Sequence, residues 1–388
     1  MTYRIPKGKL VTARSMSRIL ALLLLCLATL SIPHPAYAID PEPINVKWQN
    51  PVRQPLSLSM SAGGQYCGIV EKGGIVRIYG PKGKLQWKQK VKGATDVMVA
   101  RNGQSVLVYS RLNPIYQQVS FFRMNGSLLW TCRVKGCVWS GAVSADGMHA
   151  AVTTGERYVY LYEADPRHPS YRRWRLQGIG YSVLFTPDNK RVVVGTYQKP
   201  MLACYDLTGK MVWSSKCDSE RQYELRVSAD SKSIVGVIPA TRYNTGAEIR
   251  FWSSAGRLVW RQSLQGFDAH ALVSPQSQYV AVSYANTIPS RKGGEIVERK
   301  VAVYKADGRL LWDKGGLFFG PHLVALSPTG SSVIVSDGEH SVFNIDQRGR
   351  ILSKMNMSGS IRTAVSTEDG RRILLYCGDD WLYLMGVG

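Results

Sequence analysis

Acidic residues are scarce in this sequence. Its 388 residues include 27 Asp and Glu against 49 Lys and Arg, which gives a formal net charge of +22. A positive field of this size excludes a generally acidic surface and favours acidic partners such as anionic membrane headgroups, acidic polymers or an acidic protein. The alternative is that the excess charge only keeps the protein soluble.

Cysteine is also rare, with seven residues, no CxxC pair and no Cys/His group at zinc-ligand spacing. These absences exclude a cysteine-based metal framework. We expect most of the thiols to be reduced, buried, small apolar groups. Cys132 and Cys137 lie five residues apart across a predicted strand connection, and a disulfide between them stays open if the protein is exported.

Long hydrophobic runs are absent, since the longest extends only from Ile19 to Ile32, shorter than the roughly 20 residues that span a bilayer. Five cations and no acid precede it, and Ala36-Tyr37-Ala38 follows. This order predicts a secretory signal peptide over residues 1–38, cleaved near Ala38. The mature domain, 39–388, would then be periplasmic, on the cell surface or secreted, with a net charge of about +17. An uncleaved anchor is the alternative.

An internal repeat fills the rest of the chain. A glycine stands four residues before a tryptophan in five places, and successive tryptophans from Trp87, with Trp174 in the third place, lie 43, 44, 39, 47 and 52 residues apart. This period matches one four-stranded blade of a β-propeller. A seventh copy around Gly349 lacks the tryptophan.

Short turn sequences recur out of phase with the tryptophans. They begin at Ser61, Ala100, Ser144, Thr186, Ser228, Ser274, Ser327 and Thr367. Their Gly, Asp, Asn, Ser and Pro residues are typical of hairpin turns and do not indicate a binding site. Eight turns predict eight hairpins between the first two strands, a and b, of eight blades.

The two ends of the repeat are complementary. The last unit ends after strand c, whereas 44–48 has the spacing of an outermost strand d ending in Trp48 but precedes the first blade. Pairing the two would close the ring and remove an exposed strand edge. The sequence therefore predicts an all-β protein, a single eight-bladed β-propeller closed by its N-terminal strand. Seven blades stay open if one unit is irregular, and we expect a monomer.

The segment from Tyr205 to Trp213, with Asp206, Thr208 and Gly209 inside it, resembles the tryptophan-docking repeat of quinoprotein-like (PQQ-repeat) β-propellers. Eroded copies cover nearly all of 44–388. WD-repeat propellers are the competing family, but their Gly-His and Trp-Asp dipeptides do not recur in register. The resemblance implies a structural girdle in which each tryptophan packs on the next blade, formed by Trp48, Trp87, Trp130, Trp174, Trp213, Trp260 and Trp312.

Catalytic members of that family, as the resemblance implies, bind pyrroloquinoline quinone and calcium beside a vicinal Cys-Cys bridge. This chain has no adjacent cysteines and is much shorter than those dehydrogenases. It also lacks HExxH, Walker, GxSxG and strand-linked GxGxxG motifs. We therefore expect no cofactor and no metal, and we name no catalytic residue.

A polar ring is predicted at one mouth of the central channel. The position four residues before each turn holds Ser57, Asp96, Ser140, Ser182, Glu224, His270, Leu323 and Thr363. Propeller ligands commonly bind at a channel mouth. Asp96, Glu224 and His270 could together hold a cation or transfer protons. The simpler interpretation is that strand starts beside a wet channel tolerate polar groups.

Three long connections between strands b and c, over 110–116, 240–246 and 285–295, should emerge on the same face as that mouth. Arg and Tyr are enriched at interaction hot spots, so these loops are candidate partner sites. Their candidate residues are Arg111, Tyr116, Arg242, Tyr243, Arg291 and Lys292. Ordinary solvated loops are the alternative.

These patterns favour an exported, non-catalytic scaffold of the cell envelope that binds a protein or acidic polymer. Peripheral contact with anionic membrane stays open, and no nucleic acid partner is expected. The rival is a periplasmic or secreted enzyme, either a degenerate quinoprotein oxidoreductase or a hydrolase or lyase, with its site at the channel mouth.

Overall fold

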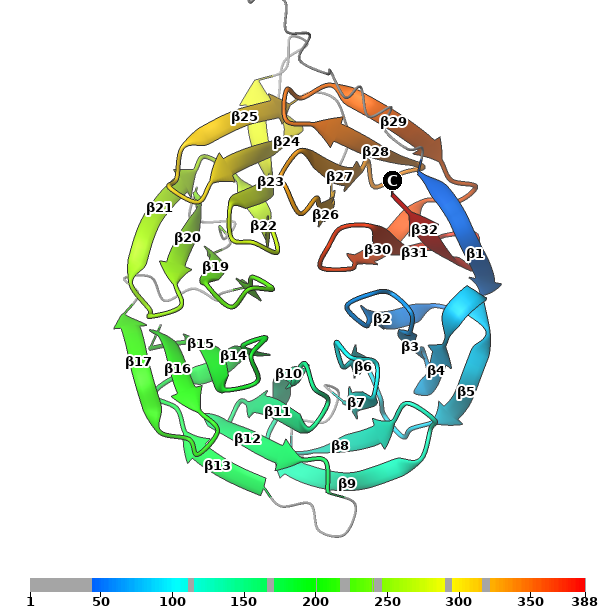
Figure 1. Cartoon of the computed structure of the whole chain (residues 1–388), viewed down its shortest axis with the longest axis vertical. Helices are drawn as coiled ribbons and strands as arrows, with labels where there is room; N and C mark the ends of the chain where they lie inside the picture. Colours follow the sequence, from blue (N-terminus) through cyan, green and yellow to red (C-terminus); the bar gives the residue numbers. More distant parts are fainter. Residues whose placement is uncertain are drawn as a thin grey trace, which may run out of the picture. The chain divides into compact units, whose positions relative to one another are not determined.

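The computed structural model describes residues 44–110, 115–165, 171–199, 201–216, 224–238, 240, 246–289, 295–315 and 322–387. These residues form eight four-stranded antiparallel sheets arranged as blades around a central channel (Figure 1). The only helical turn among them is the 3-10 turn η1 (Pro81–Gly83). The structure confirms the prediction of an all-β propeller with eight blades. No helix within the described ranges is long and apolar enough to cross a membrane.

Strands a, b, c and d of each blade run from the channel to the rim. Blade 1 contains β2 (Pro55–Met60), β3 (Cys67–Glu71), β4 (Ile75–Tyr79) and β5 (Leu85–Lys90). Blade 2 contains β6 (Asp96–Val99), β7 (Ser105–Tyr109), β8 (Tyr116–Arg123) and β9 (Leu128–Lys135). Blade 3 contains β10 (Val138–Val143), β11 (His149–Thr154), β12 (Tyr158–Glu163) and β13 (Tyr171–Arg175). Blade 4 contains β14 (Ile179–Phe185), β15 (Arg191–Tyr197), β16 (Met201–Asp206) and β17 (Met211–Lys216).

The other four blades repeat this order. Blade 5 contains β18 (Glu224–Val227), β19 (Ser233–Ile238), β20 (Ala247–Ser253) and β21 (Leu258–Leu264). Blade 6 contains β22 (Phe267–Val273), β23 (Tyr279–Pro289), β24 (Glu295–Lys305) and β25 (Leu310–Gly315). Blade 7 contains β26 (His322–Leu326), β27 (Ser332–Ser336), β28 (Ser341–Asp346) and β29 (Ile351–Asn356). Blade 8 contains β30 (Ile361–Ser366), β31 (Arg372–Cys377), β32 (Trp381–Gly386) and, from the other end of the chain, β1 (Asn45–Pro51).

The core lies between blades and is built mainly by strands b and c. Every residue of β3, β7 and β19 is buried, whereas outer strands such as β5 and β17 alternate or are largely exposed. Neighbouring blades cover the middle strands on both faces, so these strands are continuous runs of Val, Ile and Leu. The outer strands cover one blade face and meet solvent, which explains their alternation.

All eight predicted turns link strands a and b. In each, the backbone N–H of the fourth residue donates to the carbonyl of the first at 2.8–3.0 Å, and the fourth residue has a positive φ of 59–70°. Glycine fills that place in five turns because it adopts this conformation without strain. Asn189, Ser231 and Ser277 occupy it in blades 4, 5 and 6.

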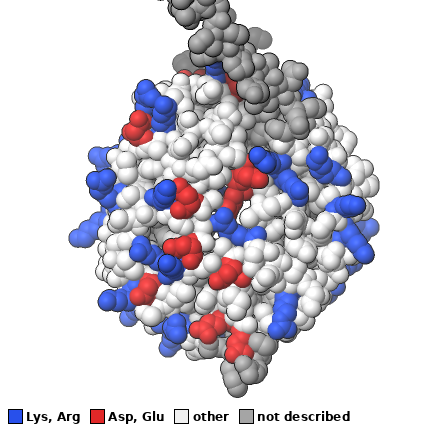
Figure 2. All heavy atoms as spheres, in the orientation of Figure 1, with Lys and Arg blue, Asp and Glu red and all other residues white. Residues whose placement is uncertain are grey.

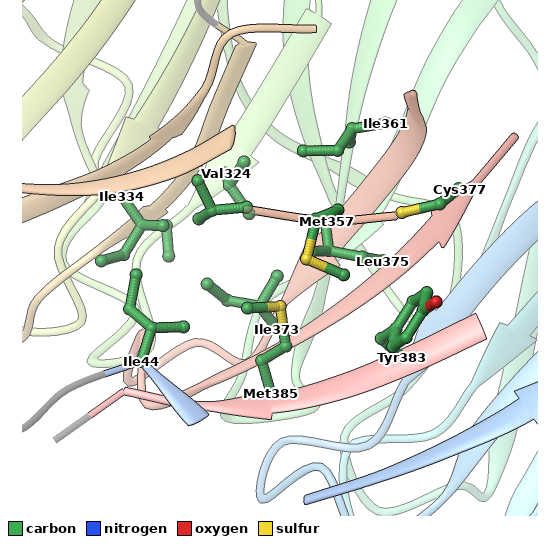
Figure 3. Packing of buried hydrophobic residues seen from close by; sticks show 12 residues of the cluster. Ile44, Val324, Ile334, Met357, Ile361, Ile373, Leu375, Cys377, Tyr383 and Met385 are labelled. Carbon is green, nitrogen blue, oxygen red and sulfur yellow. The ribbon is translucent and has the colours of Figure 1, made fainter. Parts of the chain in front are cut away.

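The N-terminal strand closes the ring as predicted. β1 pairs antiparallel with β32, with Trp48 opposite Leu384, and the Val52 N–H donates to the Asp380 carbonyl at 2.9 Å. Residue Ile44, just before β1, joins a buried cluster with Met385, Ile373 and Ile334 between blades 7 and 8 (Figure 3). The last blade is therefore completed by residues about 340 positions away in the sequence.

The repeated tryptophans lie against the following blade. The indole N–H groups of Trp87, Trp130, Trp213 and Trp260 donate at 2.8–3.0 Å to the carbonyls of Met124, Glu163, Ser254 and Ala306, respectively. The glycines of the next blade leave room for these rings. A Cβ placed on Gly209, for example, would lie 2.8 Å from the ring of Trp174. Each of these glycines thus contacts the tryptophan of the preceding blade and not the tryptophan four residues later in its own blade.

The connection expected over 285–295 is mostly a strand pair, because β23 and β24 continue to Pro289 and Glu295 and pair along that length. The expected long loop is therefore wrong as a loop, and blade 6 carries a two-stranded ribbon instead.

Cys132 has a free thiol in the structure, so it forms no disulfide with Cys137.

Candidate functional site at the channel mouth

The innermost strands carry β-bulges at the predicted channel ring. The pairing of strands a and b shifts by one residue immediately before Ser57, Ser140, Ser182 and Thr363. It also shifts by one residue before His270, where Asp268 and Ala269 together lie opposite the single residue Tyr284. A bulge leaves an extra residue outside the ladder and turns its side chain in a new direction. The bulged residues are Leu56, Trp139, Tyr181, Arg362 and the pair Asp268 and Ala269.

Two ring residues stabilise the contact between blades. The Ser57 hydroxyl oxygen accepts a hydrogen bond from the Val97 N–H at 3.3 Å, and that of Ser140 accepts one from the Val183 N–H at 3.2 Å. Both donors lie on the inner strand of the next blade, whose channel-facing edge has no neighbouring strand. These serines therefore satisfy backbone groups that would otherwise need water.

Glu224 and His270 occupy the ring in blades 5 and 6, and the structure brings them together. His270 Nδ1 lies 3.0 Å from Glu224 Oε2. Arg226, two residues along β18, forms an ion pair with the other carboxylate oxygen of Glu224. His270 is 46% exposed, so the pair is open to the channel.

A second carboxylate faces the imidazole from the other side. Asp268 Oδ1 lies 3.5 Å from His270 Nε2, and Asp268 Oδ2 accepts a hydrogen bond from Arg299 at 2.5 Å. Asp268 stands in the bulge of β22 with a φ of 52°, an unusual conformation for a residue with a side chain. Arg299 lies at the base of the β23–β24 ribbon. Five charged or titratable groups thus form a chain across blades 5 and 6.

The electrostatics of this chain favour its ionised form. Burial raises the pKa of Glu224, but Arg226 and His270 lower it more strongly, to about 2. The hydrogen bond to Glu224 raises the pKa of His270 against the opposing effect of burial. Because Glu224 is a carboxylate at neutral pH, it can only accept a hydrogen bond. Nδ1 of His270 therefore carries the hydrogen and donates this hydrogen bond to Glu224. With both ring nitrogens facing carboxylates, His270 is held in place.

A cavity of about 270 Å³ opens beside this pair. Its ionisable lining residues are Glu224, Arg226 and His270, together with Arg362 from β30. Leu272, Leu323, Val324 and Ile361 form much of its apolar wall. A smaller cavity of about 160 Å³ shares Arg226 and Leu272 and continues toward the a–b turns. The cavity therefore has both cationic and apolar walls.

The structure does not bring Asp96 to this cluster. Asp96 lies in β6 of blade 2, opposite blade 6 in the ring of eight (Figure 1). It is buried and accepts a hydrogen bond from the Thr95 hydroxyl at 2.8 Å. The proposed trio of Asp96, Glu224 and His270 is therefore reduced to a pair. Asp268 and Arg299 complete the cluster in place of Asp96.

Only Tyr116 of the six partner-site candidates lies within the described residues, and its side chain is 55% exposed. Arg111, Arg242, Tyr243, Arg291 and Lys292 lie outside them. The Gly136 N–H, between blades 2 and 3, donates to the Ile115 carbonyl at 2.8 Å. This bond places the b–c and d–a connections on one face, as expected.

Several exposed side chains on that face are apolar or aromatic. Blades 1 to 4 present the apolar or aromatic side chains of Leu56, Ile115, Tyr116, Trp139 and Tyr181, and four of these, all but Tyr181, are 40–64% exposed. The rings of Trp139 and Tyr181 lie 5.8 Å apart. We call these five residues the apolar arc. Blades 5 to 8 carry the charged cavity, and Phe267 and Val297 of blade 6 are also exposed.

The excess positive charge is not gathered into one patch on the face seen in Figure 2. Basic side chains are scattered around its margin, and acidic ones lie between them and nearer the centre. Among the residues that the structure describes, no group of three His, Cys, Asp or Glu side chains could hold a metal ion.

No family model matches this sequence, and no curated protein matches it. Solved structures match over nearly the whole propeller. The Dos1 propeller is 13% identical with a TM-score of 0.65, covering 88% of this chain and 95% of that one. The C-terminal WD40 domain of Sif2 is 12% identical with a TM-score of 0.65 (89% and 99% covered), and BamB from Moraxella catarrhalis is 14% identical with a TM-score of 0.64 (88% and 99%). At these identities the likeness shows the β-propeller fold alone.

Proposed function

We propose that this protein is an exported, non-catalytic scaffold of the cell envelope that binds a protein partner on the apolar arc. The observation that carries this proposal is the exposure of aromatic and aliphatic side chains from consecutive blades on the loop-bearing face. Aromatic residues are enriched in the central, energetically dominant parts of protein interfaces. Scattered exposed apolar residues are common, but a group on one face indicates an interaction surface.

The partner would meet a preformed surface. Trp139 packs across Gly155, where an added Cβ would lie 3.2 Å from the indole nitrogen, and its ring contacts Tyr181. These neighbours limit the motion of the indole, so little side-chain entropy is lost on binding. The basic loop candidates at 242, 291 and 292 belong by sequence to blades 5 and 6, and their charge would speed association with an acidic partner. The affiliation with quinoprotein-like propellers belongs to this proposal and rests on the repeat at 205–213.

A pull-down from envelope extract with a double variant tests the proposal. Tyr116→Ala with Trp139→Ala should weaken partner recovery at least about 30-fold, because losing a hot spot costs about 2 kcal/mol or more. The matched control is Met211→Ala with Leu258→Ala, which removes two similarly exposed apolar side chains from outer strands. Equal recovery by both double variants would contradict docking on the apolar arc.

A triple variant distinguishes a protein partner from an acidic-polymer partner. Changing Arg242, Arg291 and Lys292 to Glu should slow association with a protein but leave a complex that the apolar arc still holds. Complete loss of binding in this variant, with full binding by the Tyr116 and Trp139 variant, would show that an acidic polymer and not a protein is the partner. That result would overturn the proposal.

A further inference from the structure

The cavity lined by blades 5 to 8 contains a cationic side chain, Arg362, that forms no ion pair with the described residues. Arg362 is exposed on the bulge of β30, lines the cavity, and has no ion-pair partner among the described residues. Among the described residues of the lining, Glu224 is the only acidic one, and Arg226 already neutralises it. The lining thus carries one surplus positive charge when His270 is neutral and two when it is protonated.

Ser336 provides an independent sign of a ligand. Its side chain is fully buried at the end of β27 and lines the same cavity, yet its hydroxyl oxygen has no hydrogen-bond partner among the residues that the structure describes. A buried hydroxyl without a partner is costly, and nearly all such groups in proteins are satisfied. A hydroxyl in the wall of a cavity can be satisfied by whatever fills that cavity.

The remaining wall is apolar. Leu272, Leu323, Val324 and Ile361 face the space from blades 6, 7 and 8. Ligand sites typically combine such a lining with a few polar groups that fix orientation. A purely inorganic anion would leave this wall in contact with water, whereas a ligand with a short hydrocarbon body would cover it.

We propose that this cavity binds a small amphiphilic carboxylate, with its carboxylate against Arg362 and the Ser336 hydroxyl and its apolar body against the wall from β22, β26 and β30. The chemistry is shared by a free short-chain acid and by the C-terminus of a peptide with an apolar last residue. Guanidinium groups suit carboxylates because their parallel N–H donors match the two oxygens. The site differs in residues and blades from the apolar arc, so it goes beyond the scaffold proposal.

Three probes test this inference by NMR chemical-shift titration of the full propeller. Hexanoate should bind saturably. Hexanamide, which has the same shape but no charge, should bind about tenfold or more weakly, since a charge-assisted hydrogen bond is lost. Acetate should also bind at least about tenfold more weakly, because each buried methylene adds affinity. Equal binding of hexanoate and hexanamide, or no saturable binding of hexanoate, would overturn the proposal.

Two variants locate the site. Arg362→Gln should lower hexanoate affinity about tenfold or more without unfolding the protein, because Arg362 is exposed; Arg371→Gln, an exposed cation beside the a–b turn of the same blade, is the matched control. Ser336→Ala should weaken hexanoate binding while leaving the unliganded protein at least as stable, since its hydroxyl has no partner to lose. Unchanged hexanoate affinity in Arg362→Gln would exclude the assigned cavity.

N-acetyl-leucine, measured in parallel, separates the two sources of carboxylate. Tighter binding than hexanoate supports a peptide C-terminus, and weaker binding supports a free acid. The outcome is independent of the pull-down, because a protein partner held on the apolar arc would still be recovered by Arg362→Gln. Failure of the carboxylate site and failure of the scaffold proposal are therefore distinguishable.

Discussion

His270 illustrates how a side chain that is nearly half exposed can still be firmly placed. Its imidazole lies between Glu224 and Asp268, and each carboxylate is in turn bound by an arginine. The hydrogen bond that His270 donates to Glu224 raises the pKa of His270, while burial and Arg226 oppose the rise. Ionised His270 is therefore favoured in the folded protein relative to the unfolded chain.

The titration of His270, followed by NMR of the imidazole, should have a midpoint above the ordinary value of about 6.5. Glu224→Gln should lower this midpoint more than Asp268→Asn does, because only Glu224 lies within hydrogen-bond distance, at 3.0 Å against 3.5 Å. The same midpoint shift in both variants would show that general charge, and not the hydrogen bond, holds His270.

The sign of the pH effect on stability follows from the raised pKa. The stabilisation is fully present below the unfolded-state pKa near 6.5 and disappears as the pH rises through the folded-state pKa of His270. His270→Gln should therefore lower the melting temperature more at acidic than at alkaline pH. Because the side chain is partly exposed, solvent reduces the effect.

Sequence spacing located Glu224 and His270 because both occupy the same place relative to a turn. It did not separate them from Asp96, since only the closed ring shows that blade 2 faces blade 6. Asp268, Trp139 and Arg362 were missed because each stands in a bulge, which no local pattern announces. A signal was available: each immediately precedes, or lies two residues before, a ring position.

The tryptophans of strand d show how one element stabilises the next blade. The Trp260 indole N–H donates to the Ala306 carbonyl at 2.9 Å, whereas that of Trp312 has no hydrogen-bond partner within the described part of the chain. Glycines at the equivalent turn of the next blade, such as Gly256 and Gly308, admit the rings. The equivalent glycine of blade 7, Gly349, contacts the Lys314 side chain and not a tryptophan ring.

Trp260→Phe should therefore cost about 1 kcal/mol more in free energy of unfolding than Trp312→Phe, the value of one lost hydrogen bond. Both changes shrink the ring by the same amount, so their difference isolates the indole N–H. Urea unfolding of the two variants measures it. A larger loss in Trp312→Phe would show that ring packing, and not the hydrogen bond, dominates these contacts.

Sequence patterns predicted the strand order of the blades but misjudged one element. Asn286, Thr287 and Pro289 have loop-like composition, yet these positions pair with β24 up to Glu295. Polar residues are compatible with a strand pair whose side chains meet solvent, as that of the exposed Thr287 does. Composition alone could not distinguish such a ribbon from a long loop.

At the scale of the whole molecule, the position of each blade depends on closure of the ring. Each blade buries its faces only against its neighbours, and blade 8 is completed by β1 from the opposite end of the chain. Cluster residues of blade 1, including Cys67 and Ile69, pack with Leu382 and Leu384 of blade 8. The channel-mouth cavity also draws residues from blades 5 to 8, so it exists only in a closed ring.

Hydrogen exchange of the propeller with and without residues 44–51 tests closure most directly. Without β1, we predict faster exchange of backbone amides in β32, whose edge is exposed, and also in blade 1, whose interface with blade 8 loses support. Retention of full protection in both β32 and blade 1 after the deletion would contradict a ring closed by its N-terminal strand.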